Sequence, residues 1–221
     1  PAEILTESLL STVYGIRTQV IRDHDQPVAI VTQRPIRLLP DSLKDPNSLL
    51  RDIFSRGKTT PQLILVTGLS GVGKTTWCAR LIDLARASGL SVSGVLSPSL
   101  LDQERKIGIQ VLNLSTSESR QLATLRTAED KVLSTPRWTF NETTLEWANE
   151  ALARAGDSDL LVIDELGPLE FFKNQGLTAG LKRLDAGQYQ VAVAVIRSSL
   201  LPNALQRWPN AIVVNGGWQA S

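Results

Sequence analysis

Residues 68–75 read Gly-Leu-Ser-Gly-Val-Gly-Lys-Thr, a pattern whose residue types suit the binding of a polyphosphate. Glycines let the backbone adopt positive φ and come close to phosphate groups that side chains would keep away. The N–H groups of such a loop converge on an anion at the start of a helix, whose dipole favours negative charge. We expect Lys74 to reach the β- and γ-phosphates and the Thr75 hydroxyl to bind Mg²⁺. The residues predicted to contact a nucleotide are Gly68, Ser70, Gly71, Val72, Gly73, Lys74, Thr75 and Thr76.

The segments on either side of this loop support the prediction. Residues 62–67 form a short apolar run typical of a buried strand, and residues 76–87 have helical spacing that stops at Gly89. A strand, a glycine-rich loop and a helix in that order are the context in which the phosphate-binding motif is found. The alternative is an ordinary glycine-rich turn that binds nothing, and these flanking segments disfavour it.

A pair of acids, Asp164 and Glu165, follows a second apolar run at residues 160–163. An acid at the carboxyl end of a parallel strand faces the same crevice as the phosphate loop. We expect Asp164 to hold Mg²⁺ together with Thr75, and Glu165 to orient or deprotonate the attacking water. The pair therefore favours hydrolysis over simple switching, whereas the alternative is a strand that ends in two solvated acids.

Arg197 follows another buried-strand pattern, at residues 191–196, and should emerge at the same edge of the sheet. There it is a candidate catalytic residue that contacts the γ-phosphate, with a solvent-facing arginine as the equal alternative. Trp138 and Phe140 are candidates for stacking on a nucleotide base, although packing in the core or in a surface groove is more common for such side chains.

The rest of the chain alternates between strand and helix patterns. Asn141 is a suitable N-cap for a helix that runs to Ala155. The alternation predicts an α/β fold, a P-loop NTPase domain with a mostly parallel sheet and helices on both faces. The other expected strands are residues 91–97, 106–112 and 211–214, and the other expected helices are residues 174–184 and 199–207.

The composition of the 221 residues, 42% hydrophobic and 20% charged, is typical of a soluble globular protein with a real core. A net charge of +1 gives no electrostatic reason to expect nucleic acid or an anionic membrane as a partner. His24 is the only histidine and Cys78 the only cysteine, which excludes a histidine-based metal site and an intramolecular disulfide. We expect Cys78 to be a buried structural thiol. The default location is the cytoplasm.

Residues 164–170, Asp-Glu-Leu-Gly-Pro-Leu-Glu, resemble the corresponding motif of the small nucleoside-triphosphatase family first known from thermophiles. Residues 94–98 and 105–109 are similar to the second strand and the following hairpin of that family. The resemblance covers roughly residues 61–214. It implies a compact P-loop domain that slowly hydrolyses ATP, GTP and other triphosphates with Mg²⁺.

By position, the resemblance assigns Lys74 and Thr75 to phosphate and metal, Asp164 to the metal and Glu165 to the attacking water. Glu170 matches the motif of the family, but its residue type suggests no independent physical role. Two further classes stay open, namely a nucleotide or small-molecule kinase and a regulatory module whose nucleotide occupancy is read by a transporter.

The first part of the chain has a different pattern. Residues 2–15 predict a short helix, and residues 17–22 and 28–31 predict a hairpin around a polar turn. This stretch resembles the C-terminal tail of a metal-chelate-type ABC importer ATPase, and an unrelated extension that packs on the main domain is the alternative. No Leu-Ser-Gly-Gly-Gln signature follows the phosphate loop, so that loop is not the ABC site. The matching residues are Leu5, Thr6, Leu10, Val13, Tyr14 and Gly15.

The predicted organisation is a helix and hairpin at residues 1–37, a connector with a short helix at residues 38–60, and a P-loop NTPase domain at residues 61–221. If the tail resemblance holds, the chain is the C-terminal module of a longer transporter ATPase. It would then associate with a membrane subunit at the inner face of the membrane. The start at Pro1 and the lack of methionine agree with that hypothesis, but removal of an initiator methionine explains Pro1 equally well.

Overall fold

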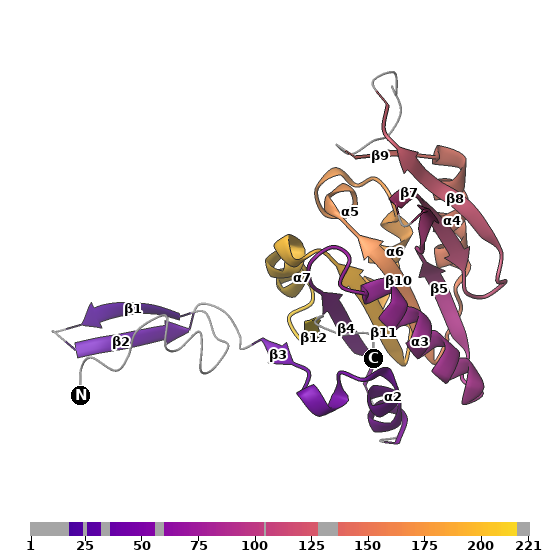
Figure 1. The fold of residues 1–221 in the computed structure, drawn as a ribbon. Coiled ribbons are helices and arrows are strands. Elements are labelled where there is room, and N and C mark those ends of the chain that lie inside the picture. The colour runs from indigo at the N-terminus through magenta and orange to yellow at the C-terminus, as the bar shows by residue number, and fades with distance from the viewer. Residues whose placement is uncertain are drawn as a thin grey trace.

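A ten-stranded mixed sheet with helices on both faces dominates the computed structural model, which describes residues 18–23, 26–31, 36–55, 60–103, 105–127 and 137–215 (Figure 1). The strand order is β3-β12-β4-β11-β10-β5-β7-β8-β9, and β6 pairs with β7. The strands are β3 (Arg37–Leu38), β4 (Gln62–Thr67), β5 (Val92–Leu96), β6 (Ser99–Asp102), β7 (Arg105–Asn113), β8 (Ser119–Leu125), β9 (Trp138–Phe140), β10 (Leu160–Leu166), β11 (Val191–Ile196) and β12 (Ile212–Asn215).

Two layers of helices cover this sheet. One hydrophobic cluster joins the sheet to α2 and α3, and a second cluster joins its other face to α4, α6 and α7. The predicted α/β fold is therefore confirmed. The helices are α2 (Pro46–Ser55), α3 (Lys74–Ala87), α4 (Glu142–Arg154), α5 (Pro168–Lys173), α6 (Thr178–Ala186) and α7 (Leu201–Arg207), with 3₁₀ turns η1 (Asp41–Leu43) and η2 (Ser198–Leu200).

The central strands are apolar on both sides because each is covered on both faces. In β4, Leu63 and Leu65 join the cluster of α4 and α6, whereas Ile64 and Val66 join the cluster of α2 and α3. The same period of two continues in β10 and β11. Because side chains on both faces are buried in the two hydrophobic clusters, the central strands and their ends are held in fixed positions.

The parallel strands β4, β5, β10, β11 and β12 end at one edge of the sheet. The phosphate loop follows β4, the Asp164–Glu165 pair lies near the end of β10, and Arg197 follows β11. The topology therefore brings the three predicted features to one edge. Beyond β5 the sheet continues with antiparallel strands β7, β8 and β9, of which the sequence pattern had indicated only β7.

Most predicted elements are present, and one helix is placed differently. Asn141 caps α4 as expected, because its side-chain oxygen accepts a hydrogen bond of 2.9 Å from the Thr144 N–H. The single helix expected at residues 174–184 is wrong at its start, because α5 ends at Lys173 and α6 begins only at Thr178. Asn174 and Gly176 both have positive φ, which no α-helix continues through.

The segment expected to be a connector packs on the P-loop domain. Strand β3 pairs with β12 in parallel, and α2 buries Leu49, Leu50 and Ile53 in the same cluster as α3. The predicted hairpin is present as β1 (Thr18–Asp23) and β2 (Gln26–Val31), which pair antiparallel. The predicted helix at residues 2–15 lies outside the described residues, so the tail resemblance and the domain boundaries stay predictions. Within the described ranges, no helix has the length and apolarity needed to cross a bilayer.

Gly94 is the glycine on which the contact between β5 and β10 depends most. It has φ +105° and pairs with Val162, and a Cβ atom added to it would lie 1.9 Å from the Val162 carbonyl oxygen. We predict that Gly94→Ala lowers the free energy of unfolding by about 2–4 kcal/mol, measured by urea denaturation. Gly156→Ala is the matched control, since no atom lies within 4 Å of the added Cβ. Equal stability of the two variants would contradict this account.

Candidate active site

The phosphate loop has the backbone geometry that its glycines predict. Gly68, Gly71 and Gly73 all have positive φ, and a Cβ atom added to Gly71 or Gly73 would meet no atom within 4 Å. Gly73 is the N-cap of α3 and supplies no side-chain cap. A bound phosphate needs room close to the backbone and N–H donors at the start of a helix, and this loop offers both.

Lys74 begins α3 and folds back over the loop. Its ammonium donates hydrogen bonds to the Gly68 carbonyl at 3.0 Å and the Leu69 carbonyl at 2.7 Å. Burial lowers the pKa of Lys74, and the carboxylates of Asp164 and Glu165 oppose that shift. The ammonium is thus held at the mouth of the loop, where it can reach an anion.

Asp164 is fully buried beneath the loop. Its Oδ2 accepts a hydrogen bond of 3.0 Å from the Ser97 N–H, whereas its Oδ1 has no hydrogen-bond partner among the described atoms. Burial raises the pKa of Asp164 to about 7, and the adjacent Glu165 carboxylate adds to that shift. The Ser97 N–H and the Thr75 side chain act in the opposite direction. An unpartnered buried carboxylate oxygen near a hydroxyl is a pair of ligands that suits a hard cation.

A β-bulge separates the roles of Asp164 and Glu165. In the pairing of β10 with β11, Ile163 faces Ala194 and Leu166 faces Ile196, so two residues oppose the single Val195. Glu165 has φ +74°, a left-handed conformation that costs a non-glycine residue of order 1–3 kcal/mol. The extra residue turns the Glu165 side chain into the cleft while Asp164 stays in the core. Bulges and strained residues of this kind cluster at active sites. The sequence pattern did not indicate the bulge.

A cleft of about 440 Å³ lies above the loop, and its charged lining is mainly positive. Lys74, Lys106, Arg137 and Arg197 line it together with one acid, Glu165. The structure thus brings the predicted residue Arg197 to the phosphate loop. Lys106 and Arg137 were not predicted, because the β6–β7 hairpin that carries Lys106 and the residue before β9 lie far from the phosphate loop in the sequence.

The remaining predicted residues have different degrees of exposure. Ser70 is exposed and lines the cleft, Val72 and Thr75 are half-buried, and Thr76 is exposed in the first turn of α3. Trp138 is only 6% exposed and packs in the core, as does Phe140 at its edge, while Trp138 also lines the cleft, so stacking on a base stays a prediction. Cys78 is buried, as predicted.

Glu170 has a structural role that its residue type alone did not reveal. Its Oε2 accepts a hydrogen bond of 2.7 Å from the Gly167 N–H, and its Oε1 accepts one of 2.8 Å from the Leu177 N–H. A Cβ atom on Gly176 would lie 2.0 Å from Oε1, so the carboxylate and this turn fit only a glycine. One carboxylate therefore fixes both Gly167, the N-cap of α5 two residues after Glu165, and the approach to α6.

A phosphate loop after β4, a buried acid near the end of β10 and a mostly parallel sheet covered on both faces define a P-loop NTPase. Comparison with known proteins narrows this class. The family described as NTPase matches residues 63–214. The chain therefore belongs to the NTPase family.

The relatives of this chain are nucleoside-triphosphatases. The protein named Nucleoside-triphosphatase THEP1 from Methanopyrus kandleri is 29% identical over 62% of this chain and 76% of its own length. Its counterpart from Methanocaldococcus jannaschii is 33% identical over 49% of this chain, and the match spans 63% of that relative. The solution structure of a human cancer-related nucleoside triphosphatase superposes with a TM-score of 0.55 at 23% identity, covering 70% of this chain and 88% of that one. This last similarity shows a shared fold.

We predict that Glu170→Gln lowers the free energy of unfolding by about 1–3 kcal/mol, measured by urea denaturation. An amide accepts at only one of its two terminal atoms, so one of the two backbone N–H groups would face another donor. Glu146→Gln, at an exposed position of α4, is the control and should change little. If the two variants are equally stable, the carboxylate does not hold the turn.

Proposed function

We propose that the chain is a Mg²⁺-dependent nucleoside-triphosphatase that hydrolyses ATP- and GTP-type nucleotides. The observation that carries the proposal is that Lys74 and Glu165 line one cleft of about 440 Å³, with the buried Asp164 carboxylate close enough to Lys74 to act on its pKa. The names of the related nucleoside-triphosphatases support the same reaction.

The residues beneath the loop suit a magnesium ion. Asp164 offers an unpartnered carboxylate oxygen and Thr75 a hydroxyl, and oxygen ligands are those that Mg²⁺ prefers. Within the described residues, no group of three or more His, Cys, Asp or Glu side chains is placed to hold a metal ion. Two protein ligands are nevertheless enough for Mg²⁺, which keeps several waters and shares the substrate phosphates. When bound there, the ion would neutralise charge on the phosphates.

In the proposed reaction, Lys74 and the loop N–H groups hold the β- and γ-phosphates. Glu165 orients a water molecule and takes its proton as the water oxygen bonds to the γ-phosphorus. The bond from the γ-phosphorus to the oxygen bridging to the β-phosphate breaks, and the nucleoside diphosphate leaves with that oxygen. Arg197 is in the same cleft and is a candidate to contact the γ-phosphate.

A small chamber next to Glu165 has room for the attacking water. A side chamber of about 40 Å³ adjoins Glu165 and Arg197, between Ser97, Phe140 and Leu169. A cavity needs roughly 10–15 Å³ to hold one water, so this chamber admits a few waters but not a nucleoside. Glu165 also lines the larger cleft of about 440 Å³, so phosphate release without an added acceptor is the measurement that separates hydrolysis from a kinase reaction. A regulatory role with a transporter rests only on the tail resemblance and stays a prediction.

Two variants separate binding from turnover. We predict that Glu165→Gln keeps the affinity for Mg-ATP and lowers phosphate release by at least roughly 10²-fold, because it removes the proton acceptor. Lys74→Ala should instead weaken the binding of a fluorescent ATP analogue, because it removes the charge at the β- and γ-phosphates. Unaltered hydrolysis by Glu165→Gln would exclude Glu165 as the base, and unaltered affinity of Lys74→Ala would place the nucleotide elsewhere.

A further inference from the structure

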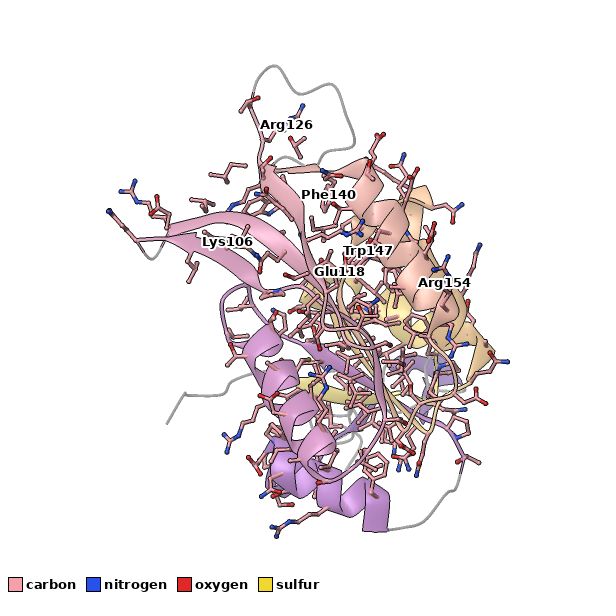
Figure 2. All side chains as sticks on the ribbon, turned by 90° about the vertical axis from the view of Figure 1, so that its right-hand side faces the viewer. Lys106, Glu118, Arg126, Phe140, Trp147 and Arg154 are labelled. Atoms are coloured by element: carbon pink, nitrogen blue, oxygen red, sulfur yellow. The ribbon has the colours of Figure 1, made fainter. Side chains whose placement is uncertain are left out.

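Lys106 enters the nucleotide cleft from outside the phosphate loop. It lies near the start of β7, at the hairpin that joins β6 to β7, and its half-buried side chain lines the cleft with Lys74 and Glu165. Figure 2 shows Lys106 near the projecting end of this hairpin. The hairpin is a separate element from those that carry the loop and the acids, so it brings an additional charge to the site.

The hairpin is built so that Lys106 has a defined position. A register shift between Leu100 and Leu101 in the β6–β7 pairing places Lys106 opposite Leu101. Two residues further along β7, a Cβ atom on Gly108 would lie 2.9 Å from the Ala123 carbonyl oxygen, so β7 runs close to β8 at this point. The strand beneath the side chain is therefore closely packed.

Trp138 supports the Lys106 side chain itself. The ammonium lies 5.3 Å from the centroid of the Trp138 ring, within the range of a cation–π contact. Trp138 is 6% exposed and belongs to the core, so the ring is a fixed surface rather than a mobile one. The resulting contact positions a cation at the wall of the cleft.

Burial distinguishes Lys106 from the two arginines of the cleft. Arg137 and Arg197 line the same cleft but are exposed, whereas Lys106 is half-buried. The Arg137 guanidinium also lies 5.0 Å from the centroid of the Trp138 ring, so the two cations share this aromatic surface.

We propose that Lys106 is a catalytic cation that contacts the γ-phosphoryl group and stabilises the charge that develops during its transfer to water. This inference rests on the proposed function. In the transition state, negative charge spreads over the γ-oxygens and the oxygen that leaves with the β-phosphate. A fixed ammonium at this position acts without reorganisation, as fixed donors do in other active sites. The chain thus supplies in cis a charge that some P-loop enzymes receive from a partner.

The test compares Lys106→Met with Arg105→Met, a change at the exposed neighbouring residue that does not line the cleft. We expect Lys106→Met to lower kcat for ATP by roughly 10²–10³-fold with little change in KM, because the contact strengthens in the transition state. Arg105→Met should keep the wild-type rate. Lys106→Arg should recover a large part of kcat, because it restores the positive charge.

A second readout separates this role from a structural one. The complex of Mg-ADP with aluminium fluoride mimics the γ-phosphoryl group in the transition state of its transfer. Lys106→Met should weaken the binding of this complex and leave the affinity for Mg-ADP alone unchanged. If Lys106→Met changes neither kcat nor the affinity for the complex of Mg-ADP with aluminium fluoride, the proposal is overturned. A raised KM with unchanged kcat would also overturn it, because Lys106 would then only bind the ground state. If the wild-type protein itself releases no phosphate, the proposed function fails instead.

Discussion

The site depends on the β-bulge that separates Asp164 from Glu165. In a regular strand, successive residues point to opposite faces of the sheet, and Glu165 would point to the face opposite Asp164. The extra residue opposite Val195 instead lets Asp164 stay buried beneath the loop while Glu165 enters the cleft with φ +74°. The segment that follows the strained residue is held by the hydrogen bonds that Glu170 accepts from the Gly167 and Leu177 N–H groups.

The electrostatics of the cleft follow from this arrangement. Two acids close together, one of them fully buried, are costly unless a cation compensates, and the raised pKa of Asp164 expresses that cost. Four basic side chains line the cleft around them, namely Lys74, Lys106, Arg137 and Arg197. Under the proposed function, a polyphosphate with its metal ion would match both parts, because the phosphates would contact the basic side chains and Asp164 would hold the metal through its unpartnered oxygen. Family membership and the charges that line the cleft therefore both support nucleoside triphosphates as the substrate class.

Local sequence predicted those parts of the site that lie within one strand–loop–helix unit. The phosphate loop, the acids near the end of β10 and the edge position of Arg197 follow from buried-strand patterns and from the rule that parallel strands end at one edge. The bulge could not be predicted, because it is a property of the register between β10 and β11. Lys106 and Arg137 reach the cleft through antiparallel pairing of β7, β8 and β9, which no local period specifies. Glu170 was recognisable only as part of a motif, since its partners are backbone N–H groups.

The most direct measurement is phosphate release from ATP, GTP, CTP and UTP by the wild-type protein, with Mg²⁺ and with a chelator. Our account predicts release from ATP and GTP without any added acceptor, and loss of that release when the chelator removes the metal. No release from any triphosphate in the presence of Mg²⁺, or an unchanged rate with the chelator, would contradict a metal-dependent hydrolytic site.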